Sequence, residues 1–138
     1  MKKLLRLVFV GALSLSSCKK DETTTPVAAQ STATIIKGGG WGVGYIQTPS
    51  GQKAANYKAY EIIFGTSGIT ARTTTEDVNG EYAVSKSNGI EMLTIALNTT
   101  NTTLMELNAD WTINSASNNK IDLSFIDSKG SRSLTLVK

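Results

Sequence analysis

Alternation of apolar and polar side chains dominates residues 120–137, which read KIDLSFIDSKGSRSLTLV. Ile121, Leu123 and Phe125 alternate with polar neighbours before the turn at 128–130, and the same alternation resumes after it. A period of two sends successive side chains to opposite faces of a strand. The glycine of the turn allows the chain to reverse its direction. The stretch therefore predicts an antiparallel β-hairpin with one buried face.

The same period of two recurs along the rest of the chain. Strands are predicted at 41–47, 59–65, 69–74, 81–85, 91–97, 111–114, 120–126 and 133–137. Most of their centres lie about 9 to 12 residues apart, the spacing of an antiparallel sandwich or barrel. Further glycine turns are expected at 66–68, 78–80 and 87–89, and one helical turn at 103–107. The sequence therefore predicts an all-β fold.

One face of these strands is apolar and forms the expected core. Its members are Trp41, Val43, Tyr45, Tyr60, Ile62, Phe64, Ile69, Tyr82, Val84, Leu93, Ile95, Leu97, Trp111, Ile113, Ile121, Leu123, Phe125, Leu134 and Leu136. The residues between them, such as Glu61, Thr70 and Asp122, are polar. A sheet with one solvent-facing side has this pattern.

The first 17 residues have the layout of a secretory signal peptide. Lys2, Lys3 and Arg6 lie at or near its start, and a largely apolar run follows from Leu4 to Leu15. A membrane-spanning helix needs about 20 apolar residues, so this run is too short for a permanent span.

Leu15, Ser16 and Ser17 end this segment. Together with the next residue, Cys18, they resemble the lipobox of bacterial lipoproteins. The resemblance implies a diacylglycerol on the Cys18 sulfur, cleavage before Cys18 and acylation of the new amino terminus. The alternative is an ordinary secretory signal beside a chance cysteine. The expected organisation is a signal peptide at 1–17, a lipidated flexible tether at 18–37 and a β domain at 38–138.

The start of the tether carries a short charged run. Lys20, Asp21 and Glu22 resemble the export signal that sends some lipoproteins to the outer face of the outer membrane. We therefore expect a lipid-anchored outer-membrane protein that faces the cell exterior. The alternative is the periplasmic face of that membrane.

Charge and composition exclude several functions. The net charge is +3, but residues 1–17 hold three of the 14 basic residues and none of the 11 acidic ones. The remainder is therefore formally neutral, and we expect no nucleic-acid partner. With no histidine and a single cysteine, the chain lacks the common metal ligands and the imidazole of nucleophilic triads. We expect no metal and no cofactor.

Glycines are dense at 38–44, just before the first predicted strand. The segment has neither G-x-G-x-x-G spacing nor a Gly-Lys-Ser/Thr ending, and no helical pattern follows it. We interpret it as a flexible entry into a strand rather than a phosphate-binding loop.

Several short segments together resemble a family of small bacterial lipoproteins with a lipocalin-like β-barrel domain. They are Gly39-Gly40-Trp41, Tyr60-Glu61-Ile62-Ile63-Phe64, Gly80-Glu81-Tyr82, the segment from Leu107 to Ile113, Lys120-Ile121-Asp122-Leu123 and Leu134-Thr135-Leu136. The family usually has Gly-x-Trp where this chain has Gly80-Glu81-Tyr82. The resemblance implies an eight-stranded up-and-down barrel, either filled by side chains or wide enough for one small ligand.

Three functional hypotheses follow. The first is a binding module for a small apolar or amphipathic ligand, lined by Trp41, Tyr45, Tyr60, Phe64 and Trp111, although each of these side chains also fits an ordinary core. The second is a solid-core structural or interaction domain that contacts a protein or glycan partner.

The third hypothesis is an enzyme with paired carboxylates. Glu106 and Asp110 are the candidate pair, as in glycosidases. Asp110 is more simply a hydrogen-bonding residue before a strand. We therefore expect a non-enzymatic protein.

Overall fold

A computed structural model describes residues 30–138. The described elements are α1 (Thr32–Ile36), β1 (Gly40–Thr48), β2 (Gly51–Gln52), the 3-10 helix η1 (Ala54–Tyr57), β3 (Glu61–Phe64), β4 (Ile69–Arg72), β5 (Asp77–Ser87), β6 (Ile90–Leu97), α2 (Thr102–Met105), β7 (Ala109–Ala116), β8 (Lys120–Asp127) and β9 (Gly130–Val137). The predictions for Cys18, Lys20, Asp21 and Glu22 lie outside the described residues.

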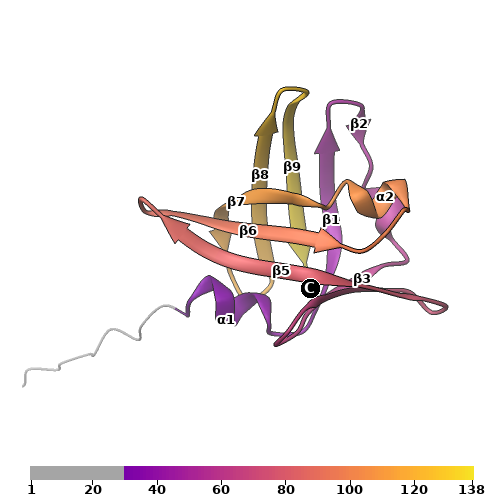
Figure 1. Ribbon diagram of the computed structural model, residues 1–138, viewed down its shortest axis with the longest axis horizontal. Helices are drawn as coiled ribbons and strands as arrows, with labels where there is room; N and C mark the ends of the chain where they lie inside the picture. Colours follow the sequence, from indigo (N-terminus) through magenta and orange to yellow (C-terminus); the bar gives the residue numbers. More distant parts are fainter. Residues whose placement is uncertain (1–29) are drawn as a thin grey trace, which may run out of the picture.

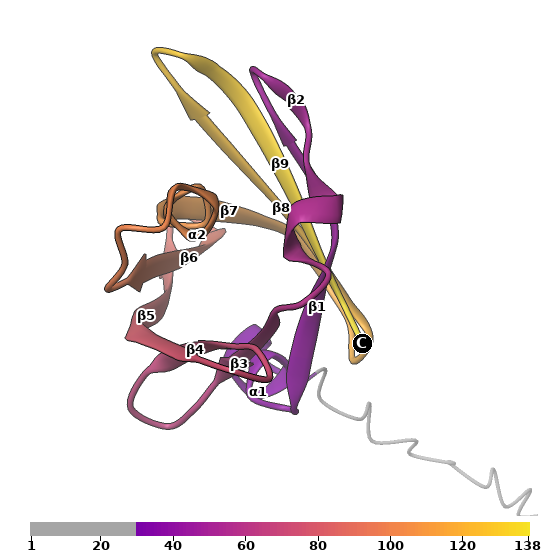
Figure 2. The same ribbon diagram turned by 90° about the vertical axis from the view of Figure 1, so that its right-hand side faces the viewer.

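The strands form a closed antiparallel barrel. Each of the eight strands β1 and β3 to β9 pairs with its neighbour in chain order, and β9 returns to pair with β1. The short strand β2 is an added hairpin on β1. Seen end on, the strands make a ring (Figure 2). The strand spacing alone left a sandwich and a barrel open, and the β1–β9 pairing confirms the eight-stranded up-and-down barrel that the family resemblance implies.

The hairpin predicted from residues 120–137 is confirmed. β8 and β9 pair without interruption from Lys120↔Val137 to Asp127↔Gly130. Gly130 has a φ of 127°, which only glycine adopts readily. Each of the other predicted strands also overlaps an observed one, and the helical turn expected near 103–107 is α2.

One predicted turn is wrong. Residues 78–80 lie inside β5, where Gly80 pairs with Leu97 of β6 and with Ile69 of β4. The chain reverses earlier instead, at Thr73, whose N–H donates to the Glu76 carbonyl at 2.8 Å. The Thr73 hydroxyl accepts from the Glu76 N–H at 3.1 Å and supports this turn without any glycine.

A β-bulge in β1 overturns the expected direction of Tyr45. The β1–β9 register shifts between Val43 and Tyr45, so that two residues of β1 stand where one would continue the alternation. Ile46 becomes the buried residue, and Tyr45 is 41% exposed. The prediction that Tyr45 belongs to the core face is therefore wrong.

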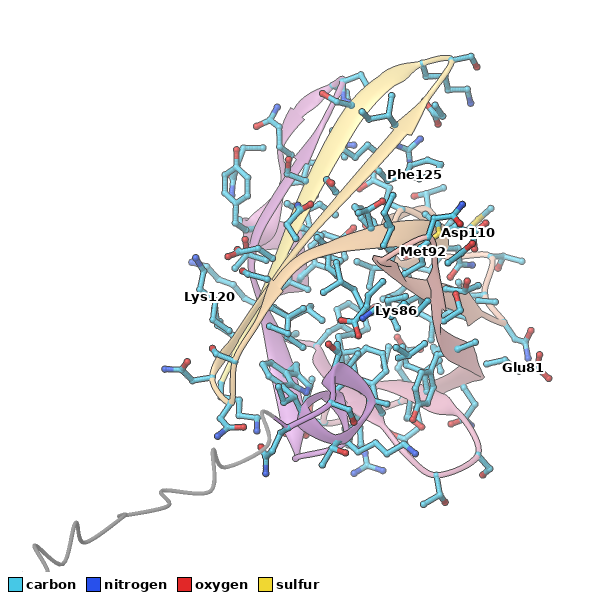
Figure 3. All side chains as sticks on the ribbon, turned by 90° about the vertical axis from the view of Figure 1, so that its left-hand side faces the viewer. Glu81, Lys86, Met92, Asp110, Lys120 and Phe125 are labelled. Atoms are coloured by element: carbon cyan, nitrogen blue, oxygen red, sulfur yellow. The ribbon has the colours of Figure 1, made fainter. Side chains whose placement is uncertain are left out.

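The barrel interior is filled by large apolar side chains. Fully buried members of the core include Trp41, Trp111, Tyr57, Ile62, Leu93, Leu104, Ile121 and Leu123. Most of the outward-pointing residues that alternate with them are polar; Glu81 and Lys120 point away from the barrel in Figure 3. This apolar interior provides the main stabilisation of a domain that contains no disulfide among its described residues.

Helix α1 closes one end of the barrel, in the foreground of Figure 3. Ile36 is completely buried, and its carbonyl accepts a hydrogen bond from Trp41 Nε1 at 2.8 Å. The Thr32 hydroxyl donates to Glu91 Oε2 on β6 at 2.6 Å. Residues 32–36, which the sequence assigns to the tether, therefore pack against the barrel.

The opposite end is closed by η1 and α2, on the near side of Figure 2. Tyr57 of η1 and Leu104 of α2 are both buried. The carbonyl of Leu107, just after α2, accepts from Trp111 Nε1 at 2.8 Å. Each of the two tryptophans therefore holds the segment that closes one end of the barrel. Both buried indole N–H groups have a hydrogen-bond acceptor.

None of the described helices is long and apolar enough to cross a membrane.

Candidate functional site

Three of the five aromatic residues predicted to bind a ligand are core residues. Trp41 and Trp111 have no exposed surface, and Phe64 is 2% exposed. Phe64 packs edge-on against Tyr82, with ring centroids 5.0 Å apart, and Trp111 lies 6.1 Å from Phe125. Their rings are thus in contact with other side chains of the barrel, which is the packing role that the sequence also allowed.

The other two aromatic residues lie elsewhere. Tyr60 precedes β3, and its hydroxyl donates to Glu76 Oε1 at 3.3 Å and accepts from Asn101 Nδ2 at 3.2 Å. Tyr45 lies on the outside of β1 and donates to Gln47 Oε1 at 3.3 Å. The structure therefore does not gather the five residues into one internal pocket.

Trp41 and Tyr60 do border one shallow depression on the outer surface. Its volume is about 340 Å³, and Glu61 and Lys138 also line it. The Lys138 ammonium lies 4.7 Å from the centre of the Trp41 ring and donates to the Gly38 carbonyl at 2.9 Å. The chain's own lysine thus occupies the position over the indole that a cationic ligand would take.

The two carboxylates considered for catalysis are engaged separately. Glu106 forms an ion pair with Lys53, and the Tyr57 hydroxyl lies 3.1 Å from Glu106 Oε2. Asp110 accepts a hydrogen bond from the Thr94 hydroxyl at 2.7 Å on the outer face of the sheet. No group of three or more acidic residues among positions 30–138 is arranged to hold a metal ion.

A depression also runs over the outer face of β6, β7 and β8. Met92, Asp110 and Phe125 border it on the upper part of the barrel in Figure 3, and its volume is about 290 Å³. Ile126, which also lines it, is 79% exposed. An exposed isoleucine next to a shallow depression suits contact with a larger partner better than enclosure of a small ligand.

Another pocket lies where the tips of the β1–β2 and β8–β9 hairpins approach the end of α2; we call it the hairpin pocket. Its volume is about 200 Å³, and it is lined by Thr48, Pro49, Ser50, Glu106, Lys129 and Arg132. The two tips are close together, since a Cβ added to Gly130 would lie 3.3 Å from the Pro49 ring. Segments about 80 residues apart in the sequence thus build one site.

Only Glu106 of these six residues is expected from the sequence to belong to a site. Arg132 shares the inward-facing set of β9 with Leu134 and Leu136, and its side chain is mostly buried. A charged residue in an otherwise apolar register is the signal that points to it. No sequence signal indicates that Thr48 and Ser50 lie near Arg132, because that proximity depends on barrel closure.

Tyr57 joins η1 to α2 beside this pocket. Its hydroxyl lies 2.6 Å from the Thr103 carbonyl oxygen, to which it donates. Burial, followed by the nearby Glu106 carboxylate, raises the pKa of Tyr57 well above its ordinary value near 10. The folded protein therefore holds this proton more tightly than the unfolded chain does.

Replacing Tyr57 with phenylalanine is expected to lower the unfolding free energy by about 1–2 kcal/mol at neutral pH, because one buried hydrogen bond is lost. The stability linked to the raised pKa is fully present below about pH 10 and is lost as the pH rises toward the folded pKa. Chemical denaturation at pH 8 to 11 should give a shallower decline for the variant than for the wild type. An equally steep decline in Tyr57→Phe would show that this tyrosine is not the group responsible.

No protein-family model, curated protein or solved structure matches the chain.

Proposed function

We propose that the protein is a lipid-anchored, non-enzymatic barrel module that acts by binding at its outer surface. The observation that carries this proposal is the closure of the barrel around a packed interior. Trp41 and Trp111 are both fully buried, and each donates its indole N–H to the segment that covers one end. These contacts favour an interaction domain over a container for a small apolar ligand.

The proposed anchor is the diacylglycerol on Cys18 that the lipobox resemblance implies. Several acyl chains on one residue hold a protein stably on a membrane, whereas a single chain binds only marginally. The run Lys20, Asp21 and Glu22 supports a position on the outer face of the outer membrane. Labelling of lysines on intact cells with a membrane-impermeant reagent tests on which face of the outer membrane the domain lies. We expect labelling of intact cells, whereas labelling only after lysis would indicate the periplasmic face.

Native mass spectrometry of the full chain purified from membranes tests both parts of the proposal. We expect the mass of a chain that begins at Cys18 and carries covalent acyl groups. We also expect no apolar molecule retained at one per chain, because the core leaves it no place. Cys18→Ser is the matched control, and it should lack the acyl mass.

Two results would contradict the proposal in different ways. A wild-type chain without acyl mass would contradict the proposed lipid anchor. A stoichiometric apolar adduct that is released on collisional activation would restore the internal-ligand hypothesis, with Trp41, Phe64 and Trp111 as its first candidates.

A further inference from the structure

The hairpin pocket has an excess of positive charge. Lys129 and Arg132 line it together with one carboxylate, Glu106, which is already paired with Lys53. Asp127 lies 3.3 Å from one Arg132 Nη atom. Within residues 30–138, the Lys129 ammonium forms no ion pair with any carboxylate. Two carboxylates therefore face three cations, and one positive charge is not compensated.

Arg132 has donors to spare. A guanidinium carries five N–H groups, and in the described part of the chain only its contact with Asp127 provides an acceptor. Its Nε is buried and has no hydrogen-bond partner among these residues. A buried donor without an acceptor is costly, and a bound water or ion is one of the partners that satisfy such donors in native proteins.

The guanidinium is also held in place before any ligand arrives. Its central carbon lies 5.7 Å from the centre of the Phe125 ring, which supports it from one side. Because the group is planar and partly buried, it loses little side-chain freedom when it binds an anion.

Hydroxyl groups form another part of the pocket wall. The Thr48 hydroxyl donates to the Gly51 carbonyl at 3.2 Å and lies 2.9 Å from the Ser50 hydroxyl. This wall is polar without being negatively charged, so it does not repel an anion. A volume of about 200 Å³ suits a small molecule or the charged end of a larger one.

We propose that the hairpin pocket binds a small oxyanion, a carboxylate or phosphate group, through Arg132 and Lys129. Guanidinium groups pair with both kinds of oxyanion by two parallel hydrogen bonds, whereas an ammonium adds a point charge. The proposal rests on the proposed function, since it identifies one place where the outer surface recognises a ligand. The pocket lies at the hairpin tips, far from α1, where the chain enters the barrel (Figure 1). The site is therefore on the side of the domain remote from α1.

The test is a titration of the full chain with inorganic phosphate and, separately, with succinate, followed by backbone amide NMR shifts. Sodium chloride at matched ionic strength is the reference, because it screens charge without offering an oxyanion. We expect saturable shifts at amides of residues 48–51 and 127–132 with at least one probe. The probe that binds more tightly identifies the preferred oxyanion.

Arg132→Met should weaken binding by roughly tenfold or more, since it removes the charge-assisted hydrogen bonds. Lys129→Met should weaken it by about two- to fivefold, because the lysine is exposed and its charge is screened. Arg72→Met is the matched control. Arg72 is also paired with one aspartate, Asp77, but lies on β4, outside the pocket.

Absence of saturable shifts with both probes would overturn the proposal. Wild-type affinity in both Arg132→Met and Lys129→Met would overturn it as well. If Arg132→Met does not fold, the exposed position of Lys129 keeps the second variant informative. Mass spectrometry tests the lipid anchor and the closed interior, and its outcome does not change the result of this titration. The two proposals can therefore fail separately.

Discussion

Replacing Trp111 with alanine is expected to lower the unfolding free energy by about 3–5 kcal/mol, the usual cost of truncating a buried tryptophan. Trp111 has no exposed surface, packs near Phe125 of β8 and donates to the Leu107 carbonyl. The variant therefore loses core packing and the attachment of α2 at once. Small domains are stable by about 5–15 kcal/mol, so a large share of the total would disappear. Denaturant titration followed by circular dichroism measures the loss.

Tyr45→Ala is the matched control for this prediction. The sequence assigns Tyr45 and Trp111 to the same core face, whereas the structure exposes 41% of Tyr45 and none of Trp111. Tyr45→Ala should therefore cost less than about 1 kcal/mol. Similar losses for the two variants would contradict the outward position that the bulge in β1 gives to Tyr45. Trp111→Phe should fall between them, because it keeps most of the packing and leaves the Leu107 carbonyl without its donor.

Replacing Gly80 with alanine is expected to destabilise the protein by about 3 kcal/mol, the upper end of what overpacking usually costs. A Cβ on Gly80 would lie 2.2 Å from the Ala96 carbonyl oxygen and 2.6 Å from the Leu97 Cα. Both atoms belong to the backbone of β6, which cannot rotate away as a side chain can. β5 and β6 would have to separate locally, and their hydrogen bonds would weaken.

Gly42→Ala provides the comparison. Gly42 also lies inside a strand, but a Cβ there would come no closer than 3.7 Å to the Val137 carbonyl oxygen, an ordinary contact. This substitution should change the unfolding free energy by less than about 1 kcal/mol, since alanine also has less backbone entropy to lose than glycine. Thermal unfolding of the two variants in parallel measures the difference, and equal melting temperatures would exclude the clash at Gly80.

Local signals in the sequence were sufficient for most of the fold. The turn at 87–89 was predicted from its glycine, and Asn88 and Gly89 both have positive φ, as in a two-residue hairpin turn. The turn predicted at 78–80 is wrong, because the glycine in this segment has a different role. Gly80 is required by the close approach of β6, not by a reversal of the chain.

Much less of the candidate site could be predicted from the sequence. The aromatic residues suit ligand contacts by their type, but buried aromatic side chains serve a core as readily as a binding pocket. The structure instead brings together Ser50 and Arg132, which have no shared pattern in the chain. Their proximity follows from the pairing of β1 with β9, which closes the barrel.

The sequence by itself determined the all-β class, the positions of the strands and the polar outer face, because a period of two is a property of neighbouring residues. Tertiary structure alone decided that Tyr45 points outward, that α1 covers one end of the barrel and that Arg132 lies beside Thr48. Each of these depends on register and closure between segments far apart in the chain. Such contacts are fixed by how the whole barrel packs, and no local pattern specifies them.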